Sequence, residues 1–169
     1  MLLEEATHLG PVVGLGDPRD DQKPPYGVAR GYFDNKAWPE AVASLASNSS
    51  AIVLCLSDTN SLLWEIDYLA KANHLNKTLF LSHPKYMGSD DNTRLMVQLS
   101  DHLGFDEEIR ERLRTPDPRL SQETSSASVV GLFLGKSGQY QVIRSSTFSR
   151  FAYLLTLRTF FREELEKRA

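Results

Sequence analysis

Apolar runs alternate with amphipathic segments along much of the chain, and this alternation predicts strands and helices in turn. The run 51–56 (AIVLCL) is continuous and apolar, which is typical of a central strand that helices cover on both faces. The run 77–84 (KTLFLSHP) predicts the next buried strand, which ends at Pro84. Between them, apolar residues at intervals of three and four predict a helix that begins near Asn60. Strand, helix and strand at these lengths form a βαβ unit, so the two strands should be parallel.

Further elements are predicted on both sides of this unit. A short strand at 11–18 runs into a long loop rich in Pro, Gly and charge, which continues to residue 33 and precedes a helix at 38–50. The carboxyl-terminal half predicts two helical stretches, a hairpin that turns at Gly138 and a final amphipathic helix, over 93–104, 105–118, 127–145 and 148–168. In the final helix, we expect the apolar face to include Phe151, Leu154, Leu155 and Phe161. The order predicts a three-layer α/β domain over 1–169 with a mostly parallel sheet, helices on both faces and a C-terminal hairpin plus helix.

Composition narrows the class of protein. With 169 residues, 41% of them hydrophobic and 24% charged, the chain is long enough for one globular domain with its own core. Its net charge of −3 indicates no excess of lysine and arginine that would bind a phosphate backbone, so we do not expect nucleic acid as a partner. The single cysteine, Cys55, lies in an apolar run and is expected to be buried. The chain shows no leader and no spanning segment, so a cytoplasmic location is expected, with a membrane reached only through a segment absent from this chain.

Ligands of open α/β sheets bind beyond the carboxyl ends of the strands, and three segments of this chain are expected to converge there. They are Gly14 to Pro18, Ser57 to Ser61 and Ser82 to Lys85. The candidate ligand-binding residues are taken from these segments, from the first loop and from the helix after residue 60: Gly14, Gly16, Asp17, Arg30, Tyr32, Ser57, Asp58, Trp64 and His83. The four histidines lack a metal-ligand spacing, so no metal is expected.

Glu65 is the candidate catalytic residue, and two interpretations of it stay open. A carboxylate one to two turns into the helix can face the mouth of the sheet, where it would bind ribose hydroxyls or stabilise an oxocarbenium-like centre. Alternatively, an acid is favoured near a helix start by the macrodipole alone. Trp64 is likewise either a packing residue or a stacking platform. Arg30 and Tyr32 either bind a phosphate and a ring or lie on the surface.

A family resemblance rests on the segments GPVVGLGDP, PPYGVARGYF and AIVLCLSDTNSLLWEIDYLAKANHLNKTLFLSHP, which lie within residues 10–84. They resemble a cytoplasmic domain found at the end of bacterial membrane proteins, which is distantly similar to the TIR and nucleoside deoxyribosyltransferase group. The resemblance implies a flavodoxin-like, Rossmann-like fold whose core is 10–84, and it carries Ser57, Trp64 and Glu65 over as site residues. In enzymes of the TIR group, the glutamate cleaves NAD at the nicotinamide bond.

Three functions are consistent with the sequence. The first is a signalling or sensor module that binds a nucleotide-type ligand, such as NAD, or a protein partner without turnover. The alternative is an NAD or nucleotide N-glycosyl hydrolase with Glu65 as the carboxylate and Asp17 or Asp58 as a second group. The third is a structural domain whose final helix packs on a partner or on a second copy in a homodimer. The first is preferred, because fold analogy transfers architecture better than activity.

Overall fold

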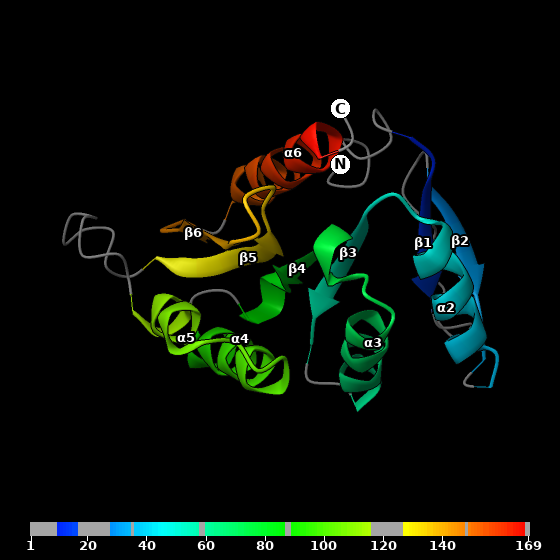
Figure 1. Cartoon of the computed structure of the whole chain (residues 1–169), viewed down its shortest axis with the longest axis horizontal. Coiled ribbons are helices and arrows are strands. Elements are labelled where there is room, and N and C mark those ends of the chain that lie inside the picture. Colours follow the sequence, from blue (N-terminus) through cyan, green and yellow to red (C-terminus); the bar gives the residue numbers. More distant parts are fainter. Residues whose placement is uncertain are drawn as a thin grey trace. The chain divides into compact units, whose positions relative to one another are not determined.

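The computed structural model describes residues 10–16, 28–34, 36–57, 60–86, 89–115, 127–147 and 149–167 (Figure 1). The chain divides into two compact units, Met1–Ser50 and Ala51–Ala169. Both units combine strands with at least one helix, so the α/β class predicted from the sequence is confirmed. That the whole chain forms one domain stays a prediction.

In its described residues, the first unit contains a pair of parallel strands and one helix. Strand β1 (Val12–Gly16) pairs with β2 (Val28–Tyr32), and α2 (Trp38–Asn48) follows. The Asp34 carboxylate accepts hydrogen bonds from the backbone N–H groups of Lys36 and Ala37, at 3.0 and 2.9 Å, just before α2 begins. This local acceptor and Pro39 in the first turn explain why the helix begins where the sequence predicts.

The strand β2 was not predicted, because the sequence indicates a loop up to residue 33. The segment VARGY has a period of two, with two small residues, Ala29 and Gly31, between larger ones. The segment contains a glycine, which is uncommon in strands, and prolines and charged residues precede it. This composition is typical of a loop, so the alternation of small and large residues was not interpreted as a strand. Arg30 and Tyr32 therefore lie on a strand and not in a loop.

The second unit is built on a mixed sheet of four strands in the order β3-β4-β5-β6. The strands are β3 (Ile52–Leu56), β4 (Thr78–Ser82), β5 (Ser128–Leu134) and β6 (Tyr140–Ser145). β3 and β4 are parallel and α3 (Asn60–Lys71) connects them, which confirms the predicted βαβ unit. β5 is antiparallel to both of its neighbours, and the turn to β6 uses Gly138 at φ +77°. Glycine adopts this conformation without strain, so the predicted hairpin is also confirmed.

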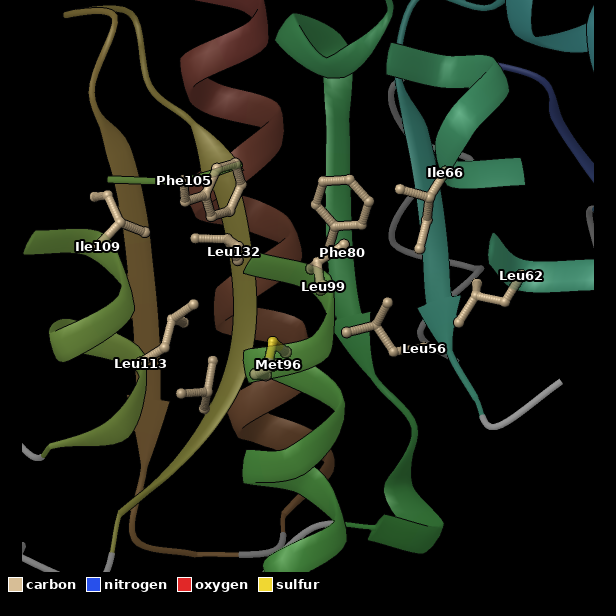
Figure 2. Packing of buried hydrophobic residues seen from close by; sticks show 11 residues of the cluster. Leu56, Leu62, Ile66, Phe80, Met96, Leu99, Phe105, Ile109, Leu113 and Leu132 are labelled. Carbon is tan, nitrogen blue, oxygen red and sulfur yellow. The ribbon is translucent and has the colours of Figure 1, made fainter. Parts of the chain in front are cut away.

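Helices cover both faces of this sheet (Figure 1). One face carries α3, α4 (Asp90–His102) and α5 (Glu107–Arg114), and α6 (Arg150–Glu166) lies on the other. Adjacent residues of β5 pack on opposite faces of the sheet. Leu132 belongs to the buried cluster under α3, α4 and α5, whereas the Phe133 ring meets Phe160 of α6 edge-on, with ring centroids 5.4 Å apart. Figure 2 shows the first cluster, in which Phe80 and Met96 are fully buried. Most of the buried apolar surface that stabilises the unit therefore surrounds β4 and β5.

β3 differs from this well-covered centre. It ends the strand order, and among the described residues nothing pairs with its outer edge. Val53 is 42% exposed and Cys55 is exposed as well, so the predictions of a central strand covered on both faces and of a buried cysteine were wrong. The thiol is nevertheless partly shielded from water, and this burial raises the pKa of the Cys55 thiol to about 11.

The final helix turns a different face to the sheet from the one predicted. Its buried residues include Tyr153, Leu157 and Phe160, while Phe151 and Leu155 are exposed. Apolar residues occur all around α6, so periodicity alone did not identify the packed face. The contact with Gly131 helps to select that face, because a Cβ added at Gly131 would lie 2.6 Å from the Thr156 methyl group.

The end of α5 is fixed by a side chain from the hairpin. The Arg144 guanidinium on β6 donates to the carbonyl oxygens of Ala127, Arg112 and Leu113 at 2.7 to 2.9 Å. Two of these carbonyl groups, those of Arg112 and Leu113, belong to the last turn of α5. Carbonyl oxygens in the last turn of a helix have no intrahelical donor. The guanidinium thus satisfies backbone acceptors that the ends of a helix and a strand leave open, and burial lowers its pKa.

Candidate functional site

The carboxyl edge of the parallel pair β3 and β4 brings two of the predicted residues together. Leu56 and Ser82 are register partners at the ends of these strands. The residues that follow them, Ser57 and His83, therefore lie at the ends of neighbouring strands, at one edge of the sheet. Ser57 is half-buried and His83 is exposed. This edge, where α3 also begins, is the candidate site of the second unit.

A buried hydrogen-bond cluster forms the rigid base of this edge. The Ser82 hydroxyl donates to the carbonyl oxygen of Val129 at 2.7 Å, and the Asn92 amide donates to the same oxygen at 2.9 Å. Val129 lies at an irregularity of the β5–β6 ladder, which the two donors stabilise. Ser82 is therefore a structural residue that connects β4 to β5. The three residues that follow it, His83, Pro84 and Lys85, are exposed.

His83 has a defined tautomer in its neutral form. Its Nδ1 atom accepts a hydrogen bond from the backbone N–H of Lys85 at 3.1 Å, so the proton of the neutral ring resides on Nε2. The ring also lies edge-on to Tyr86 at 5.9 Å. Lys85 belongs to the same one-turn helix, η2 (Pro84–Tyr86), and is exposed. An N–H donor and an ammonium group thus follow β4 directly, a pair suited to anions.

Lys85 was not among the predicted site residues. It does lie at the end of Ser82 to Lys85, one of the three segments expected to converge at the edge. A lone lysine after a proline carries no sequence signal of its own. Its position next to His83 became apparent only from the strand register and the short helix.

On α3, Trp64 and Glu65 are neighbours in sequence but point in directions about 100° apart. Leu62, Ile66 and Leu69 define the buried side of the helix. Trp64 lies opposite to them, 40% exposed, and stacks on Tyr68 with ring centroids 5.8 Å apart. Its ring therefore forms an aromatic surface on the outer side of α3.

Glu65 is half-buried and lies on one flank of α3, about 7.5 Å along the axis from the first residue. The other flank carries Asp67, whose carboxylate pairs with Nε2 of His102 on α4 at 2.8 Å. Lys71 adds a weaker ion pair to Asp67 at 3.8 Å. Because α4 lies beside the Asp67 flank, Glu65 projects on the side of α3 away from α4. Its side chain leans toward the helix start, as Cβ atoms do in α-helices.

The remaining predicted residues belong to the first unit or lie outside the described residues. Gly14 pairs with Arg30 and Gly16 with Tyr32 across the β1–β2 ladder. The Arg30 guanidinium lies 5.5 Å from the centre of the Tyr32 ring. This cation–π pair occurs within the first unit, and a common site with Ser57 and His83 stays a prediction. Asp17 and Asp58 lie outside the described residues.

The described residues show neither a metal-binding cluster nor a membrane-spanning helix. In the ranges that the structure describes, no three His, Cys, Asp or Glu side chains are grouped so that they would hold a metal ion. No helix in those ranges has the length and hydropathy needed to cross a membrane.

Comparison with protein-family models gave no match. No curated protein and no solved structure matches the chain either.

Proposed function

We propose that this protein is an α/β binding module that takes a nucleotide-type ligand, such as NAD, at the carboxyl edge of β3 and β4. In this proposal, the fold is a three-layer flavodoxin-like arrangement similar to that of TIR domains, and the ligand or a protein partner is the signal that a cytoplasmic sensor module receives. The fold analogy rests on the parallel βαβ unit and on the resemblance of residues 10–84. The site rests on the side chains at the edge.

The observation that carries the proposal is the register of β3 and β4, which sets Ser57 beside His83 where α3 begins. In open α/β sheets, this edge is the usual place for phosphates and nucleotides. His83 Nε2 and the Lys85 ammonium supply donors for phosphate oxygens, and the Ser57 hydroxyl supplies another. Glu65, on the flank of α3 opposite to Asp67, would supply acceptors for the two hydroxyls of a ribose. The set would provide donors for the phosphate oxygens and acceptors for the ribose hydroxyls.

The alternative function is hydrolysis of an N-glycosyl bond of NAD or another nucleotide. It requires Glu65 to stabilise positive charge on the sugar as the base leaves, together with a second group that activates water. The half-burial of Glu65 favours this alternative, because a carboxylate shielded from water stabilises a nearby cation more strongly.

Incubation with NAD, ADP and AMP distinguishes the two functions. Thermal stability reports binding, and chromatography of the mixture reports free nicotinamide or base. The variants are Glu65→Gln, which keeps the shape of the side chain, and the control Asp67→Asn on the opposite flank of the same helix. We expect nucleotides to stabilise the wild type and Asp67→Asn, with a smaller shift for Glu65→Gln and no base release from any protein.

Base release by the wild type and Asp67→Asn, absent from Glu65→Gln, would establish the hydrolase instead. If no nucleotide shifts the melting temperature and none is cleaved, the proposed ligand class is wrong. Equal shifts for all three proteins would leave a nucleotide site elsewhere and remove Glu65 from it.

A further inference from the structure

The turn after β4 is held by hydrogen bonds from two backbone N–H groups to His83. The His83 carbonyl oxygen accepts the N–H of Tyr86 at 3.0 Å, and Nδ1 of the His83 ring accepts the N–H of Lys85 at 3.1 Å. The second bond has the pattern of an Asx turn, in which the side-chain oxygen of asparagine or aspartate accepts the N–H two residues further on. In this turn, an imidazole nitrogen takes the place of that oxygen.

An imidazole nitrogen differs from an amide oxygen because it can gain a proton near neutral pH. Histidine is the side chain whose charge ordinarily changes between about pH 5 and 8. The neutral His83 ring accepts the Lys85 N–H at Nδ1 and keeps a donor at Nε2, whereas a protonated ring carries a proton on both nitrogens and accepts nothing. Protonation therefore breaks the hydrogen bond to Lys85 and sets two donors against each other.

The buried ring of Tyr86 contacts both exposed side chains of the turn. The His83 ring lies edge-on to it at 5.9 Å, and the Lys85 ammonium lies 5.1 Å from its centre. The Tyr86 carbonyl oxygen accepts the Ser89 hydroxyl at 2.7 Å, which links the turn to the start of α4. The place of the ammonium thus depends on the Tyr86 ring and on the backbone of Lys85, and His83 holds that backbone.

We infer that His83 is a positioning residue of the proposed nucleotide site, which fixes the backbone of Lys85 through Nδ1 and releases it when the ring is protonated. The inference rests on the proposed function for its ligand, whereas the turn can be tested without one. At neutral pH, the Lys85 ammonium and the His83 Nε2–H group are presented together. In acid, the turn or the ring must move, so both donors leave their places. The charge that the ring gains is exposed, so water screens it and it compensates little.

A pH effect in this turn can be assigned to His83 because its neighbours titrate elsewhere. In the described residues, the titratable groups of the elements at this edge are Lys85, Tyr86, Asp90, Asp91 and, on α3, Glu65. Lysine and tyrosine ordinarily titrate near pH 10, and the acids near pH 4, all outside the range from about 5.5 to 7.5. A change within that range therefore reports the imidazole.

Two substitutions separate the roles of the two ring nitrogens. His83→Asn keeps an acceptor for the Lys85 N–H, in the ordinary Asx arrangement, and takes up no proton near neutral pH. His83→Gln keeps a donor farther out, near the place of Nε2, but its longer side chain does not fit the Asx turn. His102→Asn removes an imidazole at the far end of α4 and is the control. His83 is exposed, so both variants should retain the fold, as circular dichroism would check.

The first measurement follows the Lys85 amide by NMR in the full chain without ligand, at pH 7.5 and 5.5. We expect its protection from hydrogen exchange, relative to the intrinsic rate at each pH, to fall about two- to tenfold in acid, as one hydrogen bond implies. The control should behave like the wild type. His83→Asn should stay protected at both pH values, and His83→Gln should lack protection at both. Protection that does not change as His83 titrates would overturn the inference.

The second measurement is calorimetric titration of ADP into the same proteins. The ratio of wild-type to His83→Asn affinity should fall about two- to tenfold from pH 7.5 to 5.5, and this ratio cancels the protonation of ADP itself. At pH 7.5, His83→Asn should bind more tightly than His83→Gln. A ratio that rises in acid, or tighter binding by His83→Gln, would mean that the ring acts by its charge or by Nε2 alone, and would overturn the positioning role. Absence of ADP binding to every protein would contradict the proposed function, and the amide measurement would still decide whether His83 holds the turn.

Discussion

β4 and β3 are neighbouring parallel strands with similar sequences, yet all five residues of β4 are buried and β3 has two exposed residues. The side of the second unit around β4, β5 and α6 is closed, with Phe80, Phe133 and Phe160 inaccessible to solvent. The side around β3 and the outer surface of α3 is open, with Val53 and Trp64 exposed.

The difference shows where the stability of the unit resides. Hydrophobic stabilisation scales with the apolar area removed from water, so substitutions on the closed side should cost the most free energy of unfolding. The open side contributes little burial, so substitutions there should change the free energy of unfolding little. The predictions below test this division, beginning with the largest expected effect.

Replacement of Phe160 by Ala on the closed side should lower the free energy of unfolding by about 3–5 kcal/mol. The ring is fully buried and meets Phe133 at 5.4 Å, so its removal leaves a cavity and loses an aromatic contact. Urea denaturation followed by circular dichroism measures the change. A loss below about 1.5 kcal/mol would mean that α6 is not a firm part of the closed side.

Gly131→Ala should destabilise the unit by about 1–3 kcal/mol through overpacking. The new methyl group would lie 2.6 Å from the Thr156 methyl group and 3.1 Å from a methyl group of Leu79, so α6 must shift away from β5. The same denaturation experiment applies. Gly131→Ala combined with Thr156→Ser should recover part of the loss, because the second substitution removes the nearer methyl group. A double variant no more stable than Gly131→Ala would contradict this steric explanation.

Asp67→Asn, between the two sides, should cost at most about 1 kcal/mol. The hydrogen bond with His102 is short, at 2.8 Å, and it becomes an ion pair when the imidazole is protonated. Both side chains are partly exposed, so water and salt screen the interaction. Denaturation at low and high salt concentration should show a wild-type advantage that shrinks as salt is added. An advantage independent of salt would mean that the pair is better shielded than its exposure indicates.

Cys55→Ser on the open side should have the smallest effect on stability, within about 0.5 kcal/mol. The informative measurement is the alkylation rate of Cys55 in the folded wild type. Burial raises the pKa of the thiol from 9.0 to about 11, so its thiolate fraction at pH 8 is about 100-fold lower than that of an unperturbed thiol. The rate with iodoacetamide should therefore rise with pH up to about 11. A plateau near pH 9 would show that the sulfur is as open as the residue around it.

The strand and helix pattern of the second unit was predictable, whereas the environment of each face was not. The continuous apolar run of β3 identified it as a strand, but an all-apolar run does not distinguish an edge strand from a central one. The strand β4 has polar residues at both ends and is nevertheless the fully buried one. Apolar residues all around α6 concealed which side meets the sheet. The strand β2 was missed because arginine, glycine and nearby proline resemble a loop.

The candidate site was predicted in part. Parallel pairing implies that Ser57 and His83 share an edge, since residues at the ends of neighbouring parallel strands must meet there, and the register confirms their placement. The different directions of Trp64 and Glu65 follow from helical geometry only after the buried side of α3 is known. Lys85 could be identified only from the tertiary structure, because its position beside His83 depends on the short helix after β4 and not on any sequence motif.

The most direct test of a nucleotide site at the carboxyl edge is calorimetric titration of ADP into the wild type and Lys85→Glu. Lys71→Glu, an exposed lysine at the far end of α3, is the control. We predict that ADP binds the wild type and the control with similar affinity, and that Lys85→Glu weakens binding at least about tenfold, because a carboxylate replaces a phosphate-binding cation. Equal affinities for all three proteins, or no binding to any of them, would contradict the proposed site.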